Sequence, residues 1–279
     1  MNPTRRAAVC GMPIAHSLSP VIHNAGFAAA GLADWSYSAV ECDSADLAAL
    51  VGGLGPEWAG LSLTMPLKEE ALRLAAAATP VAVAIGAANT LVRRDDGTWQ
   101  ADNTDVAGMV RVLREAGLKP APSVAVLGGG GTARAALAAA AQFGASAVSV
   151  VTRRTAAYEE LAPAAAALGV TMIAVPWQRA PEAFEADAVI STVPKGAADH
   201  LADAVAWRDG TVLFDAIYDP WPTPLAAAAQ AHAVPVISGL DLLLAQALSQ
   251  FEQFTGVTPA PEDAMRAALF EAAAARAAG

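Results

Sequence analysis

The sequence predicts an α/β protein with two domains, and three observations support this. An apolar strand at 124–127 leads through four glycines into an alanine-rich helix that ends near Phe143. In the first hundred residues, polar side chains cluster where predicted strands end and helices begin, which is where α/β folds bind ligands. The length of 279 residues suits one large domain or two of ordinary size.

Strands and helices alternate through the N-terminal third of the chain. Ser19 is the expected N-cap of the first helix, because Pro20 at the next position is pre-organised for a first helical turn. We place the domain boundary at 103, so that 1–103 form the first domain. The predicted elements are strands at 7–10, 35–40 and 60–64, helices at 19–30, 44–51, from 66 onward and at 105–116, and a hairpin of 89–92 with 98–101.

The second domain, 104–236, carries the most informative motif. Gly128 permits a tight turn after the strand, Gly130 lets the backbone approach a pyrophosphate, and the small Ala133 lets the helix pack closely. The N–H groups at the helix start then face the phosphates. This predicts a Rossmann-type nucleotide-binding domain, and the plainer alternative is a flexible loop. The predicted contacts at this turn are Gly128, Gly129, Gly130, Gly131, Thr132 and Ala133.

The end of the next strand, 147–151, predicts NADP rather than NAD. NAD-binding domains place an acidic residue about twenty positions after the glycines, where it binds the ribose 2′-hydroxyl. This chain has Thr152, Arg153 and Arg154 there instead, and a guanidinium can bind a 2′-phosphate in a bidentate fork. The alternative is that one or both arginines lie on the solvated start of a helix, and Arg154 fits that interpretation better than Arg153 does.

The rest of the chain continues the alternation and then becomes helical. Alternating strands and helices predict a parallel or mixed sheet. Three more strands are expected at 187–191, 212–215 and 234–237, and Pro224 starts a helix after a rigid turn. From Leu240 onward the sequence is helical, with a break near 256–261, so 237–279 form a set of C-terminal helices.

The composition excludes several classes of partner. The chain has 27 acidic and 17 basic residues and a formal net charge of −10, which argues against binding to nucleic acids or anionic membranes. Cys10 and Cys42 lack metal-ligand spacing, so we expect free buried thiols in a reducing cytoplasm and no metal site. The N-terminal apolar run is too short for a signal peptide, and no stretch of about twenty residues is apolar enough for a transmembrane helix.

Four polar groups in the N-terminal domain are candidate ligand contacts. Ser17 and Ser19 stand two positions apart beside a helix N-terminus and would suit a carboxylate. Lys68, in the first turn of a helix, lies at the unfavourable end of the dipole, which fits a lowered pKa and an acid–base role. The plainer interpretations are that Ser17 is a turn residue, Ser19 only an N-cap and Lys68 an exposed surface lysine. The other two groups are Asn89-Thr90 and Asn103-Thr104-Asp105.

Together these residues resemble the shikimate dehydrogenase family. The matching motifs occur in the family's order over nearly the whole chain, which makes coincidence improbable. They are Gly11-x-Pro13-Ile14-x-His16-Ser17-x-Ser19-Pro20-x-x-His23-Asn24, Thr64-x-Pro66-x-Lys68, Gly86-Ala87-x-Asn89-Thr90, Asn103-Thr104-Asp105, Gly128-x-Gly130-Gly131-x-Ala133-Arg134, Tyr218-x-Pro220-x-x-Thr223-Pro224-Leu225 and Gln246-Ala247-x-x-x-Phe251.

The resemblance implies an oxidoreductase that reversibly reduces 3-dehydroshikimate to shikimate with NADPH, in aromatic amino-acid biosynthesis. It implies an active site in a cleft between the domains, with the C-terminal helices returning to the substrate domain. Lys68 and Asp105 would be the catalytic pair. The implied substrate contacts are Ser17, Ser19, Thr64, Asn89, Tyr218 and Gln246, and the implied cofactor contacts include Thr152, Arg153, Arg154, Thr192 and Gly239.

The departures from the family pattern lie on the cofactor side, and they bear on cofactor preference more than on substrate binding. Two rival functions stay open: a quinate/shikimate dehydrogenase of broader specificity, and a catalytically silent NADP-binding regulatory module, against which the presence of Lys68 and Asp105 argues. The protein is expected to be a monomer or a homodimer. The departures are Thr152-Arg153-Arg154 for Asn-Arg-Thr, Ser191-Thr192-Val193 for Asn-Ala-Thr, and Leu242, preceded by Asp241, for a methionine near the nicotinamide.

Overall fold

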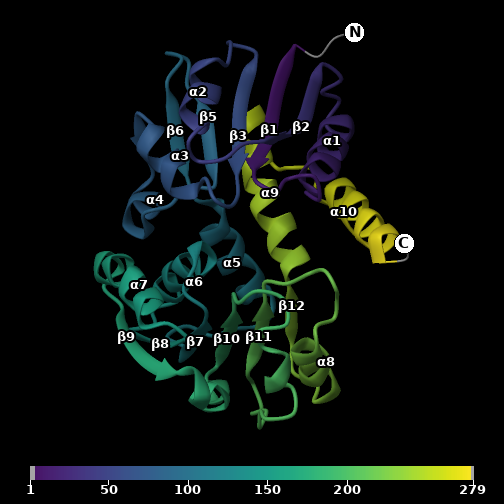
Figure 1. The fold of residues 1–279 in the computed structure, drawn as a ribbon. Helices are drawn as coiled ribbons and strands as arrows, with labels where there is room; N and C mark the ends of the chain where they lie inside the picture. The colour runs from purple at the N-terminus through teal and green to yellow at the C-terminus, as the bar shows by residue number, and fades with distance from the viewer. Residues whose placement is uncertain (1–3, 278–279) are drawn as a thin grey trace. The chain divides into compact units, whose positions relative to one another are not determined.

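The computed structural model describes residues 4–277 and divides into two compact units. Unit 1 consists of Met1–Thr104 and Leu243–Gly279, and unit 2 is Asp105–Leu242. Both divisions fall inside helices, the first in α5 (Thr104–Glu115) and the second in α9 (Gly239–Thr255), whose places in the chain are labelled in Figure 1. The predicted α/β class is confirmed, because each unit is built on one six-stranded sheet accompanied by helices.

The sheet of unit 1 is mixed and has the order β2-β1-β3-β5-β6-β4. β1 pairs in parallel with β2 and β3, whereas β5 pairs antiparallel with β3 and β6, which confirms the predicted hairpin. Buried apolar residues of β1 and β3 form its core with Leu47 and Leu67. The strands are β1 (Arg5–Gly11), β2 (Trp35–Glu41), β3 (Trp58–Leu63), β4 (Ala77–Ala78), β5 (Thr90–Arg93) and β6 (Trp99–Asp102).

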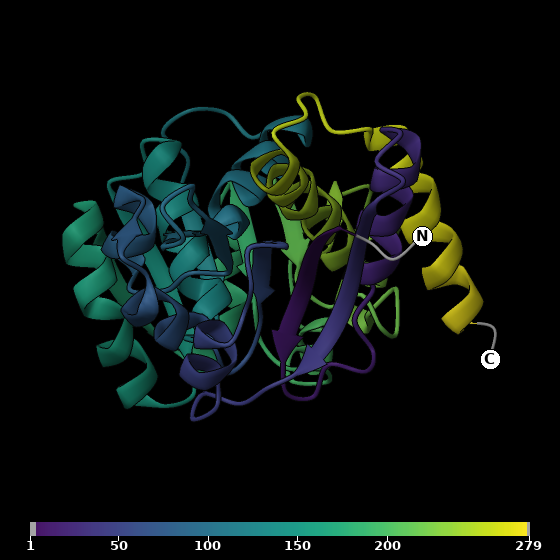
Figure 2. The same cartoon turned by 90° about the horizontal axis from the view of Figure 1, so that it is seen from above.

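Six helices complete unit 1: α1 (Ser19–Ala29), α2 (Leu47–Gly52), α3 (Lys68–Leu74), α4 (Pro80–Ile85), most of α9 and α10 (Glu262–Ala277). α10 lies beside α1 in both views (Figures 1 and 2). Gly26 permits this approach, because a Cβ at that position would lie 2.9 Å from Met265 Sδ. Ser19 is not the N-cap that the sequence predicts: Leu18 is, and its side chain makes no capping hydrogen bond. The backbone N–H of Ser19 instead donates to Ser17 Oγ at 3.2 Å.

The sheet of unit 2 is entirely parallel, with the order β12-β11-β10-β7-β8-β9. The first strand, β7, lies at the centre, and successive strands extend outward on one side before the chain crosses to the other. This is the doubly wound order of dinucleotide-binding domains, and it reverses between β7 and β10. The strands are β7 (Val124–Leu127), β8 (Ala147–Thr152), β9 (Thr171–Pro176), β10 (Ala188–Ser191), β11 (Val212–Asp215) and β12 (Val236–Ser238).

Helices accompany the strands of unit 2: α6 (Gly131–Gln142), α7 (Thr155–Leu168), α8 (Pro224–Ala231) and the 3-10 segments η1 (Trp177–Glu185) and η2 (Asp199–Leu201). One core cluster joins apolar strand residues such as Val189 and Leu213 to Phe184 of η1 and Leu225 of α8. Among residues 4–277, no helix has the length and apolar character needed to cross a membrane.

Candidate active site

In unit 1, backbone hydrogen bonds join the end of β3, the start of α3 and the turn before β5. Leu63 N donates to Asn89 O at 2.7 Å, and Ala88 N donates to the carbonyl oxygen of Lys68 at 2.8 Å. Lys68 is the first residue of α3 and is half-buried. The structure therefore brings the segment that carries Lys68 next to the segment that carries Asn89.

The side chain of Asn89 is held by three donors. Its Oδ1 accepts from Thr104 N at 2.8 Å, Thr104 Oγ1 at 3.1 Å and Thr90 Oγ1 at 2.8 Å, and the residue is 3% exposed. These bonds fix which face of the amide carries the oxygen. Thr104 precedes Asp105, a buried residue in the first turn of α5.

The remaining substrate-side candidates of the N-terminal segment follow β1 and β3. Ser17 is half-buried and Ser19 is buried, and the bond between them orients the turn that carries both hydroxyls. The carbonyl oxygen of His16 in the same turn accepts from Arg276 Nη1 of α10 at 2.6 Å. Thr64 follows β3, and its methyl group occupies the space that a Cβ at residue 11 would need, so this arrangement requires a glycine there.

α9 presents glutamines at helical spacing. Gln246 is buried, and its Nε2 donates to Leu243 O at 2.9 Å. Gln250, one turn later, is 1% exposed and bonds to the Asn89 segment, with Nε2 donating to Asn89 O at 3.2 Å. Because residues four apart lie on one helix face, Gln246 shares its face with Gln250.

In unit 2, the glycine turn after β7 has both packed and open positions. Gly128 has φ +111°, and a Cβ there would overlap Thr192 Oγ1. At Gly129 a Cβ would lie 2.8 Å from the Cβ of Ala157. At Gly130, by contrast, a Cβ would find no atom of the described residues within 4 Å. The open space therefore begins at Gly130, the N-cap of α6.

The same turn lies where the strand order of unit 2 reverses. Thr192 N and Thr192 Oγ1 both donate to Leu127 O at 2.8 Å, which joins the end of β10 to the end of β7. No side chain in the described part of the chain caps α6, so its first turn, which includes Gly131 and Thr132, presents backbone N–H groups. Ala133, completely buried, packs this helix against the sheet. Such a helix start is suited to a phosphate.

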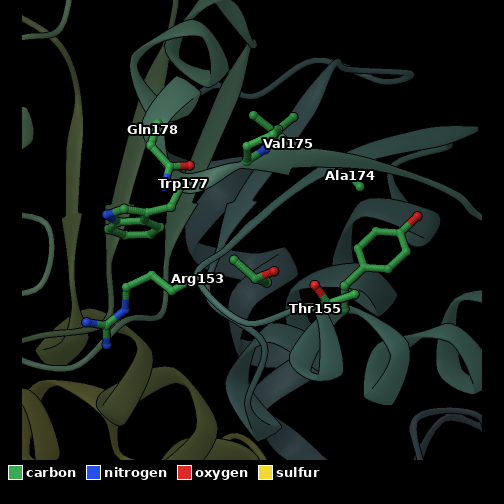
Figure 3. A pocket seen from close by; sticks show the side chains of 9 residues that line it. Arg153, Thr155, Ala174, Val175, Trp177 and Gln178 are labelled. Carbon is green, nitrogen blue, oxygen red and sulfur yellow. The ribbon is translucent and has the colours of Figure 1, made fainter.

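A pocket of about 490 Å³ opens beside the end of β8 (Figure 3). The guanidinium of Arg153 faces the indole of Trp177, with Cζ 6.0 Å from the ring centroid. Among the described residues, the lining includes Thr152 and Arg153 but not Arg154, which is the exposed N-cap of α7. A cation held over an aromatic face at the mouth of a pocket can bind an anionic group.

The loop that carries Tyr218 is fixed from two sides. The buried carboxylate of Asp215 accepts from Thr223 Oγ1 at 2.7 Å and from Ile217 N at 3.2 Å, while burial raises the pKa of Asp215. Gly239, which begins α9, packs against the same loop, and a Cβ there would lie 3.1 Å from Tyr218 Cδ1. Tyr218 is half-buried.

Comparison with known proteins identifies the family. Residues 9–91 match the family described as the shikimate dehydrogenase substrate binding domain, and residues 239–270 match the shikimate 5′-dehydrogenase C-terminal domain. The shikimate dehydrogenase (NADP(+)) of Caulobacter vibrioides is 37% identical over 262 residues, covering 91% of this chain and 90% of that protein. The chain belongs to the shikimate dehydrogenase family.

Solved structures of shikimate dehydrogenases have the same fold. The enzyme of Mycobacterium tuberculosis has 45% identity and a TM-score of 0.87, over 96% of this chain and 99% of that one. Shikimate 5-dehydrogenase of Thermus thermophilus, solved with NADP(H) and shikimate, has 29% identity and a TM-score of 0.82, over 96% and 99% of the two chains. The predicted family is therefore confirmed.

Within this shikimate dehydrogenase fold, sequence reasoning missed two residues. Trp177 lies beside Arg153 in the pocket lining of unit 2, yet its position after an exposed edge strand gave no signal in the sequence. Gln250 bonds to the Asn89 segment, and its signal was available, because it follows Gln246 by four positions on an otherwise apolar helix face.

Proposed function

We propose that this protein is an NADP-dependent shikimate dehydrogenase, which interconverts 3-dehydroshikimate and shikimate for the biosynthesis of aromatic amino acids. Family membership over 91% of the chain is the observation that carries this proposal. The presence of Lys68 and Asp105, in the first turns of α3 and α5, supports a working enzyme rather than a silent NADP-binding module.

The proposed substrate domain is 1–103, completed by the helices of 237–279, and the proposed nucleotide domain is 104–236. Direct hydride transfer needs contact between the two bound reactants, so domain closure is expected to accompany turnover. We assign the substrate carboxylate to Ser17 and Ser19, with help from Tyr218. We assign the ring hydroxyls to Thr64, Asn89, Asp105 and Gln246.

The residues around the glycine turn fit NADP. The open position at Gly130 and the uncapped first turn of α6 suit a pyrophosphate, as judged from the described residues. Arg153 in its pocket suits a 2′-phosphate, with Thr152 beside it and Arg154 as a secondary contact. When bound, NADP supplies the hydride acceptor, and NADPH the donor, for the carbon that changes oxidation state.

Lys68 and Asp105 are proposed to handle the proton. During oxidation the reacting hydroxyl loses its proton from oxygen while a hydride leaves the attached carbon, so a positioned base is required. Lys68 accepts that proton, and in the reverse direction it returns the proton to the carbonyl oxygen. Asp105 orients the substrate hydroxyl and stabilises the charged lysine.

The proposed compartment is the cytoplasm, and the proposed assembly is a monomer or a homodimer. Cys10 and Cys42 are both free and buried, which is consistent with a reducing environment. Burial raises the pKa of Cys10 to about 12, so this thiol stays protonated and unreactive at neutral pH.

The proposed function is tested by following the absorbance of the reduced nicotinamide. Shikimate and quinate are each supplied with NADP and with NAD, and initial rates are compared. Shikimate with NADP should be the most efficient of the four combinations. Comparable rates with quinate would support the broader dehydrogenase, and no reduction in any combination would support the silent module.

A further inference from the structure

A continuous series of buried hydrogen bonds ends at Asn89 in unit 1. Tyr37 Oη donates to Ser62 Oγ at 2.6 Å, and Ser62 Oγ donates to Gln250 Oε1 at 2.7 Å. Gln250 Nε2 donates to Thr90 Oγ1 at 2.9 Å, and Thr90 Oγ1 donates to Asn89 Oδ1 at 2.8 Å. All five side chains are at most 5% exposed, and we refer to them as the Tyr37–Asn89 chain.

Gln250 determines the direction of the Tyr37–Asn89 chain. Its Nε2 also lies 3.2 Å from the backbone oxygen of Asn89, which can only accept, so the amide nitrogen must face that side and the amide oxygen must face Ser62. A hydroxyl has one hydrogen. Thr90 Oγ1 accepts from Gln250, and its own hydrogen goes to Asn89 Oδ1 at 2.8 Å rather than to Thr104 Oγ1 at 3.4 Å, because the shorter contact is the stronger bond.

The backbone N–H of Thr104 and the Tyr37–Asn89 chain together hold the orientation of the Asn89 amide. With Oδ1 bonded to Thr90 and Thr104, the NH₂ group of Asn89 points to the opposite side of the amide and can only donate. We propose that Gln250 is a positioning residue that sets Asn89 as a donor to a ring hydroxyl of the substrate. This inference rests on the proposed function, in which Asn89 contacts that hydroxyl.

Gln253 offers a matched control on the same helix. Its Nε2 donates to Asp102 Oδ2 at 2.9 Å, so it also joins α9 to the sheet of unit 1 through a side-chain amide. Its hydrogen-bond partners among the described residues, Asp102 and Ser249, are not members of the Tyr37–Asn89 chain. Replacing Gln253 therefore tests whether loss of any hydrogen bond between α9 and the sheet of unit 1 lowers activity, without a direct change at Asn89.

The test is a double-mutant cycle between Gln250→Met and Asn89→Ala, measured with shikimate and NADP. Gln250→Met removes all three hydrogen bonds of the Gln250 amide and should lower kcat/KM for shikimate about tenfold, while the Michaelis constant for NADP stays unchanged. Because Gln250 acts through Asn89, the double variant should be no worse than Asn89→Ala alone. Gln253→Met should lower kcat/KM less than twofold.

Ser62→Ala provides a second variant if Gln250→Met unfolds in a thermal melt. It removes the donor to Gln250 Oε1 and the acceptor of Tyr37 Oη but keeps both Nε2 bonds of Gln250, so it should lower kcat/KM for shikimate by a smaller factor, again with no added loss on Asn89→Ala. Losses that multiply in the cycle, or an equal loss in Gln253→Met, would overturn the role of Gln250 while leaving the proposed function intact. A wild type inactive on shikimate would instead overturn the proposed function, together with the role that rests on it.

Discussion

The two units build their candidate sites from different materials. In unit 1, the Asn89 amide is oriented by side chains that are themselves oriented by other side chains, in a region that is almost fully buried. In unit 2, the glycine turn consists of backbone, and a Cβ at Gly130 would find no described atom within 4 Å. The difference indicates that the site in unit 1 is impaired by substitutions that remove side-chain atoms, whereas the turn of unit 2 is impaired by substitutions that add a side chain.

The largest effect is expected in unit 1, from Lys68→Ala. A general acid–base group contributes about a hundred- to ten-thousandfold in rate, so turnover should fall at least about a hundredfold. The Michaelis constant for shikimate should change far less, because the proposed contacts of Ser17, Ser19 and Gln246 remain. Steady-state kinetics measure both constants, and binding of NADP to the variant confirms that it is folded. Retention of more than about a tenth of wild-type turnover would remove Lys68 from the mechanism.

Asp105→Asn sharpens the same prediction. This variant should lower turnover and also raise the Michaelis constant for shikimate, because Asp105 is proposed to hold a hydroxyl. Groups that act as a unit are not additive, so the double variant with Lys68→Ala should be little worse than the worse single variant. Losses that multiply would mean that the two residues act independently.

In unit 2, Arg153 is the principal side chain proposed to bind a charged group of NADP, whereas the glycine turn is proposed to bind NADP through backbone groups. Loss of a charged hydrogen-bond partner costs about 1.5–3 kcal/mol, so Arg153→Ala should raise the Michaelis constant for NADP about ten- to a hundredfold and leave that for NAD nearly unchanged. Arg154→Ala is the matched control and should have a smaller effect, since among the described residues Arg154 is absent from the pocket lining. Equal efficiency of the wild type with NADP and NAD would contradict the role of Arg153.

Two glycine substitutions separate folding from binding in the turn. Gly128→Ala places a side chain at φ +111° and against Thr192, and should lower the free energy of unfolding by about 1–3 kcal/mol. Gly130→Ala should leave that free energy almost unchanged but raise the Michaelis constant for NADP, because the new methyl group occupies space proposed for the pyrophosphate. Denaturant unfolding gives the free energy of unfolding of both variants, and steady-state kinetics give their Michaelis constants for NADP. Unaltered NADP kinetics in Gly130→Ala would show that the pyrophosphate binds elsewhere.

The smallest effect concerns His23, a completely buried residue beside the Tyr37–Asn89 chain. Its ring stacks on Tyr37 at 4.1 Å between centroids, and the nearby Gln250 amide opposes the effect of burial on the ring only in part. Burial lowers the pKa of His23 to about 3. In the unfolded state the imidazole of His23 takes up a proton near pH 6.5, whereas in the folded state it stays neutral until about pH 3. Neutral His23 therefore costs the folded state nothing above pH 6.5, and the free energy of unfolding decreases as pH falls from 6.5 toward 3.

His23→Phe should therefore flatten the pH dependence of unfolding. The wild type should lose about 0.7 kcal/mol more than this variant when pH falls from 7 to 6, as measured by denaturant unfolding at both values. The exposed His232 provides the control, since His232→Gln should keep the wild-type slope. Identical slopes in wild type and His23→Phe would mean that His23 takes up a proton in the folded state.

The sequence predicts those parts of the molecule where local signals agree. The β7–α6 turn, the β5–β6 hairpin and the helix after Pro224 all occur close to their predicted bounds. β9, Thr171–Pro176, was missed because its sequence shows no alternation of apolar and polar residues, and all six residues of this edge strand are partly or fully exposed. Leu18 replaced Ser19 as N-cap because the turn is held by the Ser17 hydroxyl, a local bond that competes with capping.

Local sequence signals predict the candidate site less completely than they predict the helices and strands. Individual residues such as Lys68 and Asn89 can be proposed from motifs, but their partners come from distant parts of the chain. The bond from Gln250 to the Asn89 segment spans 161 positions, and the bond from Ser62 to Gln250 spans 188. Tertiary packing alone determines such contacts, which is why the Tyr37–Asn89 chain is absent from any local pattern.

One set of Michaelis constants tests most directly whether Asn89 of unit 1 serves shikimate while Arg153 of unit 2 serves NADP. The constants for both substrates are measured in the wild type, Asn89→Ala and Arg153→Ala. Asn89→Ala should raise the constant for shikimate about tenfold or more and leave that for NADP within about twofold, and Arg153→Ala should do the reverse. If either variant raised both constants equally, the assignment of Asn89 to shikimate and of Arg153 to NADP would be contradicted.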